Sequence, residues 1–438
     1  MPLRDLIVTG TMIGLLPLCL VTPWIGILVW SWIGLMNPHR LTWGFAYTMP
    51  FAMLVAVATL AGAFLTADKE RRSIPAVRET WLLLWLWAVY TATTLVALYP
   101  DEAYPHWVRV SKILLFTFLT VVFFQQRERF RWLLLVVALS LGFYGLKGAA
   151  WVLRTGGFNQ VMGPPDSFIE GNTEIGLALN MTLPLLLFLA RGEQRPWLRK
   201  LMLTMFGASI VAIVFTYSRG AFLGLAVVLM MLFLRARRRL VGILAVALLA
   251  LFVMMFVPER WFLRMDTIQA YEQDASSRGR LVAWGVAWGV ALDRPLTGGG
   301  FWVLPREEIF ERYAPGYPKV HSAHSIYFAV LGDHGFLGLA LFIGLIVSCL
   351  VSLVRLRRSV GHRPEAGWLV SYCEMTEASL VAYAVSGAFL TMAYFDLFYY
   401  LVSFVIILKG IAAREGLLVE SARSAAIPVG VPAGLRAR

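Results

Sequence analysis

The chain has 438 residues, of which 59% are hydrophobic and only 15% are charged, and its mean hydropathy is +0.70. Because a soluble domain carries about 25% charged residues, this composition excludes an ordinary soluble protein and indicates a membrane protein. The net charge of +13 lies in short basic clusters between apolar runs, which is the positive-inside pattern of membrane topology, so no nucleic-acid partner is expected.

The apolar runs predict an all-α, polytopic integral membrane protein, because each is long enough to cross a bilayer as a helix. The first segment, Leu6–Met36, is too long for one straight crossing and contains Pro23, so it forms one kinked crossing or a short helical hairpin. We interpret it as mature structure because no small-residue cleavage site follows it. One crossing, our preferred interpretation, gives twelve spans with both termini cytoplasmic; two crossings give thirteen with the N-terminus outside. The other predicted spans are Trp43–Leu65, Trp81–Leu98, Val108–Phe124, Trp132–Val152, Thr173–Ala190, Leu201–Tyr217, Ala221–Leu234, Leu240–Val257, Ser325–Val354, Thr376–Ala393 and Phe398–Ile411.

Basic clusters in every second loop predict which loops are cytoplasmic. The alternate loops, which are then exoplasmic, include Tyr99–Trp107, Arg154–Asn172, the tight turn Ser218–Gly220 and the long loop Pro258–Ala323. The expected organisation is nine or ten transmembrane helices in residues 1–257, a periplasmic loop with interfacial helices in 258–323, the last transmembrane helices in 324–415, and a disordered cytoplasmic tail in 416–438.

Arginines on the exoplasmic side are candidates for binding phosphate. Arg219 lies in the turn between two spans, where its rigid guanidinium suits a phosphate; the alternative is an arginine that anchors a helix end. In the long loop, Arg278 and Arg280 come at the start of an expected helix, where free backbone N–H groups also favour an anion. They could form a pyrophosphate clamp or simply a solvated helix start.

Apolar residues in the same loop predict that this helix lies in the membrane interface. Leu281, Trp284, Trp288 and Ala291 recur at helical spacing, with the tryptophans expected to face the membrane.

Histidines lie where the long loop re-enters the membrane. An imidazole such as that of His324 is costly there unless it has a use, and proton transfer is the expected one; the alternative is a hydrogen-bonded histidine at a helix start. His321 is three residues earlier and would share a helical face with it, whereas His334 would lie some 15 Å further along, at about 1.5 Å per residue. No carboxylate or cysteine stands at ligand spacing, so no metal site is expected.

Two further polar residues face the same side. Asn172 ends the polar loop before a span, where it either caps the next helix or reaches the exoplasmic cavity. Asp396 is a weaker candidate. The three cysteines show neither a disulfide framework nor zinc spacing.

Four short motifs follow one another in the chain: Phe168-x-x-x-Asn172, Ser218-Arg219-Gly220, Arg280-Leu281-x-x-Trp284 followed by Asp293-x-Pro295-Leu296-x-Gly298, and His324-Ser325-x9-Gly335-x-x-Gly338. Together they resemble the O-antigen ligase and polymerase superfamily of bacterial membrane glycosyltransferases. Through Met36–Gly44 and Ser140–Gly148, the chain also resembles the branch described as O-glycosylation ligases of exosortase systems.

The resemblance implies a GT-C-like enzyme of the Gram-negative inner membrane with its active site facing the periplasm. It would move a polysaccharide from undecaprenyl pyrophosphate to a sugar hydroxyl of lipid A–core, inverting the anomeric centre without a metal or other cofactor. Membrane lipids are its other expected partners. Alternatives are a protein O-oligosaccharyltransferase, an O-antigen polymerase and, less favoured, a transporter of lipid-linked sugars.

The residues that match the family motifs receive roles from the same resemblance. His324 would be the catalytic base. Arg219 and Arg280, helped by Arg278, would bind the pyrophosphate, since fixed cations stabilise a leaving group whose charge grows. The candidate donor or acceptor contacts are Asn172, Ser325 and His321.

Overall fold

The computed structural model describes residues 3–66, 73–235, 275–360 and 363–417, and within these ranges the regular structure is entirely helical. This confirms the predicted class. By length and composition, seven of the described helices could cross a membrane: α1 (Leu3–Val21), α5 (Pro100–Phe123), α6 (Arg127–Thr155), α7 (Asn172–Gly192), α8 (Pro196–Val214), α14 (Ile326–Val360) and α16 (Asp396–Arg414). Three apolar helices are shorter: α2 (Pro23–Met36), α3 (Phe51–Leu65) and α9 (Arg219–Leu234). The others are α4 (Arg78–Leu95), α12 (Ala275–Asp293), α13 (Glu307–Tyr313) and α15 (Gly367–Gly387).

The predicted total of twelve or thirteen spans stays a prediction. The expected span Leu240–Val257, the first part of the long loop and most of the expected tail lie outside the described residues. The protein is nevertheless a polytopic helical membrane protein, with α7 and α16 as its most enclosed long apolar helices.

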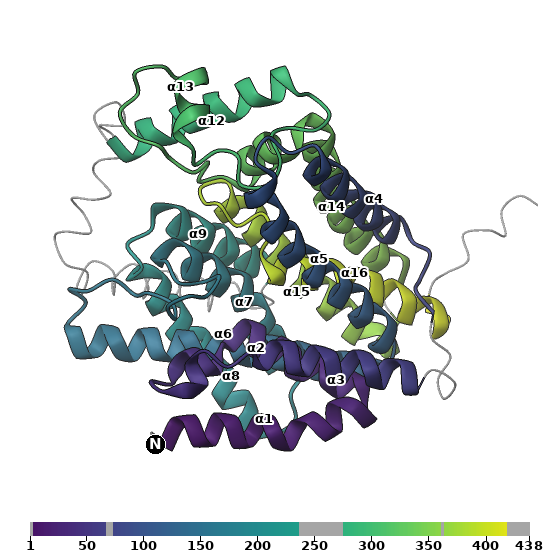
Figure 1. Cartoon of the computed structure of the whole chain (residues 1–438). Helices are drawn as coiled ribbons and strands as arrows, with labels where there is room; N and C mark the ends of the chain where they lie inside the picture. Colours follow the sequence, from purple (N-terminus) through teal and green to yellow (C-terminus); the bar gives the residue numbers. More distant parts are fainter. Residues whose placement is uncertain (1–2, 67–72, 236–274, 361–362, 418–438) are drawn as a thin grey trace, which may run out of the picture.

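The N-terminal segment doubles back, which corrects our preference for one kinked crossing. A break at Thr22 separates α1 from α2, and Pro23 begins the second helix. A Cβ added to Gly62, near the end of α3, would lie 2.2 Å from the carbonyl oxygen of Leu20 at the end of α1. At the other end of α1, the Asp5 carboxylate accepts the N–H of Ala46, 3.0 Å away. Helices α1 and α3 therefore run parallel with α2 antiparallel to both, so the segment is a hairpin (Figure 1).

The central helix α7 packs against α6, α8, α9 and α15. At the end of the bundle where the basic clusters lie, arginines are held by carboxylates: Arg235 pairs with Glu377 at 2.8 Å, and Arg357 pairs with Glu377 at 3.2 Å. We call this the basic end. The opposite end, which we call the loop end, is covered by α12 and α13 (Figure 1).

Several predicted boundaries are wrong by two or three helical turns. The expected span Thr376–Ala393 is instead α15, which runs from Gly367 to Gly387, and residues 388–395 are not helical. The expected exoplasmic loop Tyr99–Trp107 is mostly the first turns of α5, because Pro100 stands at a helix N-terminus where proline is tolerated. Helix α3 begins at Phe51, after Pro50, rather than at Trp43.

Candidate functional site

The turn that carries Arg219 is rigid, because each of its residues is held from several sides. Ser218 caps α9 by accepting the N–H of Ala221 at 3.2 Å, so Arg219 is the first residue of that helix and is only partly exposed. Tyr217 adopts a left-handed backbone conformation, with φ of 54°, and its hydroxyl donates to the carbonyl of Gly157. The guanidinium of Arg219 thus starts from a fixed backbone at a helix N-terminus, where the helix dipole also favours an anion.

Asn172 helps to fix this turn. It is the first residue of α7, but it does not cap the helix: Gly171 is the N-cap residue, and no side chain bonds there. The Asn172 amide instead donates to the carbonyl of Thr216 at 2.8 Å, two residues before Ser218. The capping alternative is therefore wrong, and the side chain joins the loop before α7 to the Arg219 turn.

His324 lies in the last residues of the loop before α14, with an unusual backbone. Its φ is 43°, in the left-handed region, and its N–H donates to the Thr391 hydroxyl at 2.9 Å. The strained backbone is maintained by its surroundings, which is typical of functional positions but does not identify one. The histidine-bearing stretch from 318 to 324 is not helical, so His321 and His324 do not share a helical face as expected.

Arg280 lies close enough to His324 to affect its titration. The pKa of the His324 imidazole is lowered to about 4, first by burial and then, to a smaller extent, by the positive charge of Arg280 and by His321. The ring of His321 packs against the backbone of α12, because a Cβ on Gly279 would lie 2.6 Å from its Nε2. The start of α12, His321 and His324 therefore form one cluster.

Helix α12 differs from the prediction in two respects. It is already helical at Ala275, so Arg280 lies more than one turn inside and its backbone N–H is not among the free ones at the helix start. Arg278 is exposed. Trp284 faces the protein rather than the membrane: its ring stacks on Phe328 and its Nε1 donates to the carbonyl of Ala323 at 2.7 Å.

The remaining predicted residues of α12 divide between two faces. Ala291 is fully buried, whereas Leu281 and Trp288 are 44% and 49% exposed and continue with Leu292 as an apolar stripe. That this stripe lies in a membrane interface stays a prediction.

Two of the sequence motifs interlock at a break in α14. Gly335 has φ of 67° and ψ of −168°, which interrupts the helix, and a Cβ there would lie 2.5 Å from the carbonyl oxygen of Pro295. The same carbonyl accepts the N–H of Phe336 at 2.8 Å, and the N–H of Gly299 donates to the carbonyl of Gly332 at 2.9 Å. The loop after α12 is thereby fastened to the helix that follows His324.

Ser325 and His334 are buried, and neither lies in the cluster around the His324 ring. Ser325 is 1% exposed, and its carbonyl accepts the N–H of Ala329 in the first turn of α14. His334 packs among aromatic rings, and its Nδ1 lies 2.7 Å from the Thr93 hydroxyl. Asp396, the weaker candidate, is partly buried at the start of α16 and faces Gly34 of α2.

The short segment 388–391 connects the two halves of the site, and sequence reasoning missed it. A Cβ on Gly220 would lie 2.9 Å from the Cβ of Phe389, so the Arg219 turn packs on this segment. Thr391, two residues later, accepts the His324 N–H. The predicted span Thr376–Ala393 concealed this segment inside a helix. The one available signal that the helix ends early was Ser386-Gly387, a serine followed by a glycine inside the predicted span.

These observations define a polytopic helical membrane protein with a cationic, histidine-containing site at one end of the bundle. The sequence model of the O-antigen ligase family matches residues 204–343, a range that contains Arg219, Arg280 and His324. This match supports the resemblance to the O-antigen ligase superfamily that the motifs carry. A family of unknown function, DUF5935, matches residues 3–194. No curated protein matches the chain.

Proposed function

We propose that this protein is an O-antigen ligase that transfers a polysaccharide from undecaprenyl pyrophosphate to a sugar hydroxyl of lipid A–core. The loop end would face the periplasm of a Gram-negative inner membrane. The observation that carries the proposal is that one short segment, 388–391, contacts both the Arg219 turn and the His324 backbone, while the charge of Arg280 acts on the His324 imidazole.

In the proposed reaction, His324 removes the proton from the acceptor hydroxyl as that oxygen attacks the anomeric carbon. The bond from this carbon to the pyrophosphate oxygen breaks, and the anomeric configuration inverts. Arg219 and Arg280 hold the departing pyrophosphate, because fixed guanidinium groups stabilise charge that develops on a leaving group. Arg278, which is exposed, would assist at the rim. No metal is assigned a role.

The low pKa of His324 has a consequence for this mechanism. With a pKa of about 4, the free imidazole is neutral but only weakly basic. A bound pyrophosphate would offset the charge of Arg280, one of the causes of the lowered pKa, and would make the imidazole more basic. Donor binding would therefore prime the base for the acceptor.

Other residues of the site receive supporting roles. Asn172 orients the Arg219 turn through Thr216, and Ser325 fixes the start of α14, so neither needs to touch substrate. His321 packs on Gly279 of α12 and is the better candidate for a donor or acceptor contact, since it is only partly buried.

The same chemistry with another acceptor is the second candidate function. A protein O-oligosaccharyltransferase or an O-antigen polymerase would use the same donor and the same residues, Arg219, Arg280 and His324. The N-terminal part resembles exosortase-associated O-glycosylation ligases, and this resemblance favours protein as the alternative acceptor. A transporter of lipid-linked sugars is less favoured, because the residues of the candidate site gather at one end of the bundle rather than midway along it.

The test is transfer of glycan from purified undecaprenyl-pyrophosphate donor to purified lipid A–core, with chelator present. His324→Gln should lower the rate by about 10²–10⁴-fold, the usual contribution of a general base. The matched control is His106→Gln, a partly buried histidine that stacks on Trp302, 4.9 Å between ring centres. This control should retain activity.

The acceptor and the mechanism are tested separately. Lengthening of the donor glycan without transfer to lipid A–core would identify a polymerase, and transfer only to a protein acceptor would identify a protein glycosylation enzyme. Full activity of a folded His324→Gln variant would refute the assignment of the base. Loss of wild-type activity in chelator would refute metal-independent transfer.

A further inference from the structure

A cavity at the basic end is independent of the loop-end site and of the proposed transfer reaction. It has a volume of about 470 Å³ and is formed where the start of α4 meets the last turns of α14 and α16. Its lining residues are Val77, Arg78, Ser352, Arg355, Leu356, Ser359, Lys409 and Ala413. Three of these eight are cations, and they come from three different helices.

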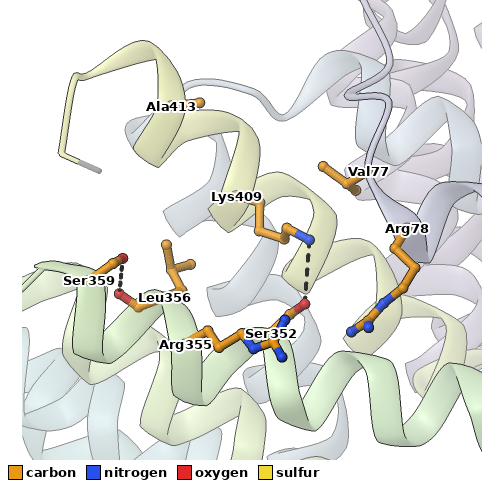
Figure 2. Close-up of a pocket in the computed structure, with 8 residues that line it drawn as sticks. All are labelled: Val77, Arg78, Ser352, Arg355, Leu356, Ser359, Lys409 and Ala413. Carbon is orange, nitrogen blue, oxygen red and sulfur yellow. Dashed lines mark hydrogen bonds between the residues drawn. The ribbon is translucent and has the colours of Figure 1, made fainter. Parts of the chain in front are cut away.

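The basic side chains converge on one space. Figure 2 shows Arg78, Arg355 and Lys409 extending from α4, α14 and α16 toward the region beside Ser352. The ammonium of Lys409 lies 3.4 Å from the Ser352 hydroxyl. The position of Arg78 is fixed as well, because its Nε donates to the hydroxyl of Ser348 at 2.7 Å.

The cavity carries more positive than negative charge. Glu79, which is fully buried, lies 2.7 Å from Lys409 and 3.7 Å from Arg78, and it offsets one of the three positive charges. The three basic side chains exceed the one carboxylate by two positive charges. Arg355 is exposed, and within the described part of the chain it has no ion pair or hydrogen bond.

The backbone of α4 adds to this preference for an anion. The helix begins at Arg78 after Val77, both of which line the cavity, and no side chain caps it, so the positive end of the helix dipole lies beside the cavity. The carboxyl ends of α14 and α16 act in the opposite sense, but their dipole effect is a fraction of a charge, whereas each basic side chain carries a full one.

The other lining residues suit the apolar part of a lipid. Val77, Leu356 and Ala413 offer an apolar wall beside the cations. The hydroxyls of Ser352 and Ser359 already donate to the Glu79 carboxylate and to the Leu356 carbonyl, so the donors to a phosphate are the three basic side chains. Helix ends at this position lie where a bilayer surface meets water, so a phosphate there can belong to a membrane lipid as well as to a free ion.

We propose that this cavity binds the phosphate of an anionic phospholipid headgroup, with Arg355 as the main phosphate ligand and with Arg78 and Lys409 beside it. A guanidinium can contact two phosphate oxygens at once, which suits Arg355 to this role.

The test uses the purified full-length protein and native mass spectrometry. The probes are phosphatidylglycerol and, as the neutral comparison, phosphatidylcholine of the same acyl chains. Phosphatidylglycerol should be retained in preference to phosphatidylcholine. Arg355→Gln should weaken its retention roughly tenfold, the effect expected from losing one strong charge-assisted hydrogen bond. Arg355→Lys should weaken it less.

The control variant separates a site from general surface charge. Arg358→Gln removes an equally exposed arginine one turn further along α14 that does not line the cavity, and it should leave retention unchanged. Equal losses in the two glutamine variants, or equal retention of the two lipids, would overturn the proposal.

Competition with inorganic phosphate distinguishes a lipid phosphate from a free phosphate ion as the ligand of the cavity. If millimolar phosphate displaces phosphatidylglycerol only weakly, the lipid is the ligand, as proposed. If phosphate binds, with loss of its binding in Arg355→Gln, while neither lipid is preferred, the cavity is a phosphate site that takes a free ion, and the assignment to a lipid is overturned.

Discussion

His324 is the residue at which structure and chemistry can be compared most directly. Burial and the charge of Arg280 hold its pKa at about 4, so the free enzyme should keep a neutral imidazole down to acidic pH. If His324 is the base, kcat/KM should fall only as the pH drops toward 4. In the donor complex the pyrophosphate offsets Arg280 and favours the protonated form, so the acid limb of kcat should lie at higher pH than that of kcat/KM. Rates measured from pH 4 to 8 at low and at saturating donor provide both limbs.

Arg280→Gln provides the control for this prediction. Without the guanidinium, the pKa of His324 in the free enzyme should rise, so the acid limb of kcat/KM should move to higher pH. The shift should be partial, since burial is the larger cause of the lowered pKa. Coincident limbs in the wild-type enzyme would contradict priming by the donor.

Asn172 provides a second prediction at the scale of single residues. Its amide donates to the carbonyl of Thr216, so Asn172→Ala leaves that acceptor without its partner at a cost of about 1–3 kcal/mol. We expect a lower midpoint of thermal unfolding in detergent and weaker donor binding, because the Arg219 turn loses a support. Asn159→Ala, which removes an exposed asparagine of the same loop, is the matched control and should change neither. Unchanged donor affinity in Asn172→Ala would show that the turn does not depend on this bond.

At the scale of elements, the break in α14 at Gly335 is required for the loop after α12 to pack against this helix. Gly335→Ala places a side chain in a backbone region that is nearly exclusive to glycine, at about 1–3 kcal/mol, and drives its Cβ against the Pro295 carbonyl. We expect strong destabilisation and release of the loop after α12. Gly344→Ala, in the same helix with open space around the new Cβ, should be neutral or stabilising by up to about 1 kcal/mol. Unfolding in detergent measures both, and equal stability of the two variants would show that the interlock contributes nothing.

The helices themselves were largely predictable, because apolar runs of membrane-spanning length admit few other structures. The turn at Ser218 was also predictable from its position between two runs. What sequence patterns could not provide was contact between distant segments: the bond from the His324 backbone to Thr391 joins residues 67 positions apart. The start of α12 was misplaced for a related reason, since its first residues are polar and lack the apolar periodicity that marks a helix.

At the scale of the whole molecule, the paired arginines and the candidate site occupy opposite ends of one bundle. Arg235 and Arg357 share Glu377 at the basic end, where the pairs tie α9 and α14 to α15. The same α15 leads into segment 388–391 at the loop end. Helix α15 thus links the basic end to the candidate site. The charge pattern of the sequence predicted only which loops lie on which side of the membrane, and not this connection.

The N-terminal hairpin makes a prediction about the orientation of the entire chain. Since α1 and α3 run parallel, the N-terminus should lie on the same side of the membrane as α13 and on the opposite side from the basic end. Single cysteines introduced as Leu3→Cys, Glu311→Cys and Arg363→Cys occupy exposed positions, and the three native cysteines are buried, so background labelling should be low. In intact spheroplasts, a maleimide that cannot cross membranes should label the first two variants and not the third. The hairpin orientation would be refuted if Leu3→Cys were labelled only after permeabilisation while Glu311→Cys was labelled from outside. The two residues would then lie on opposite sides of the membrane.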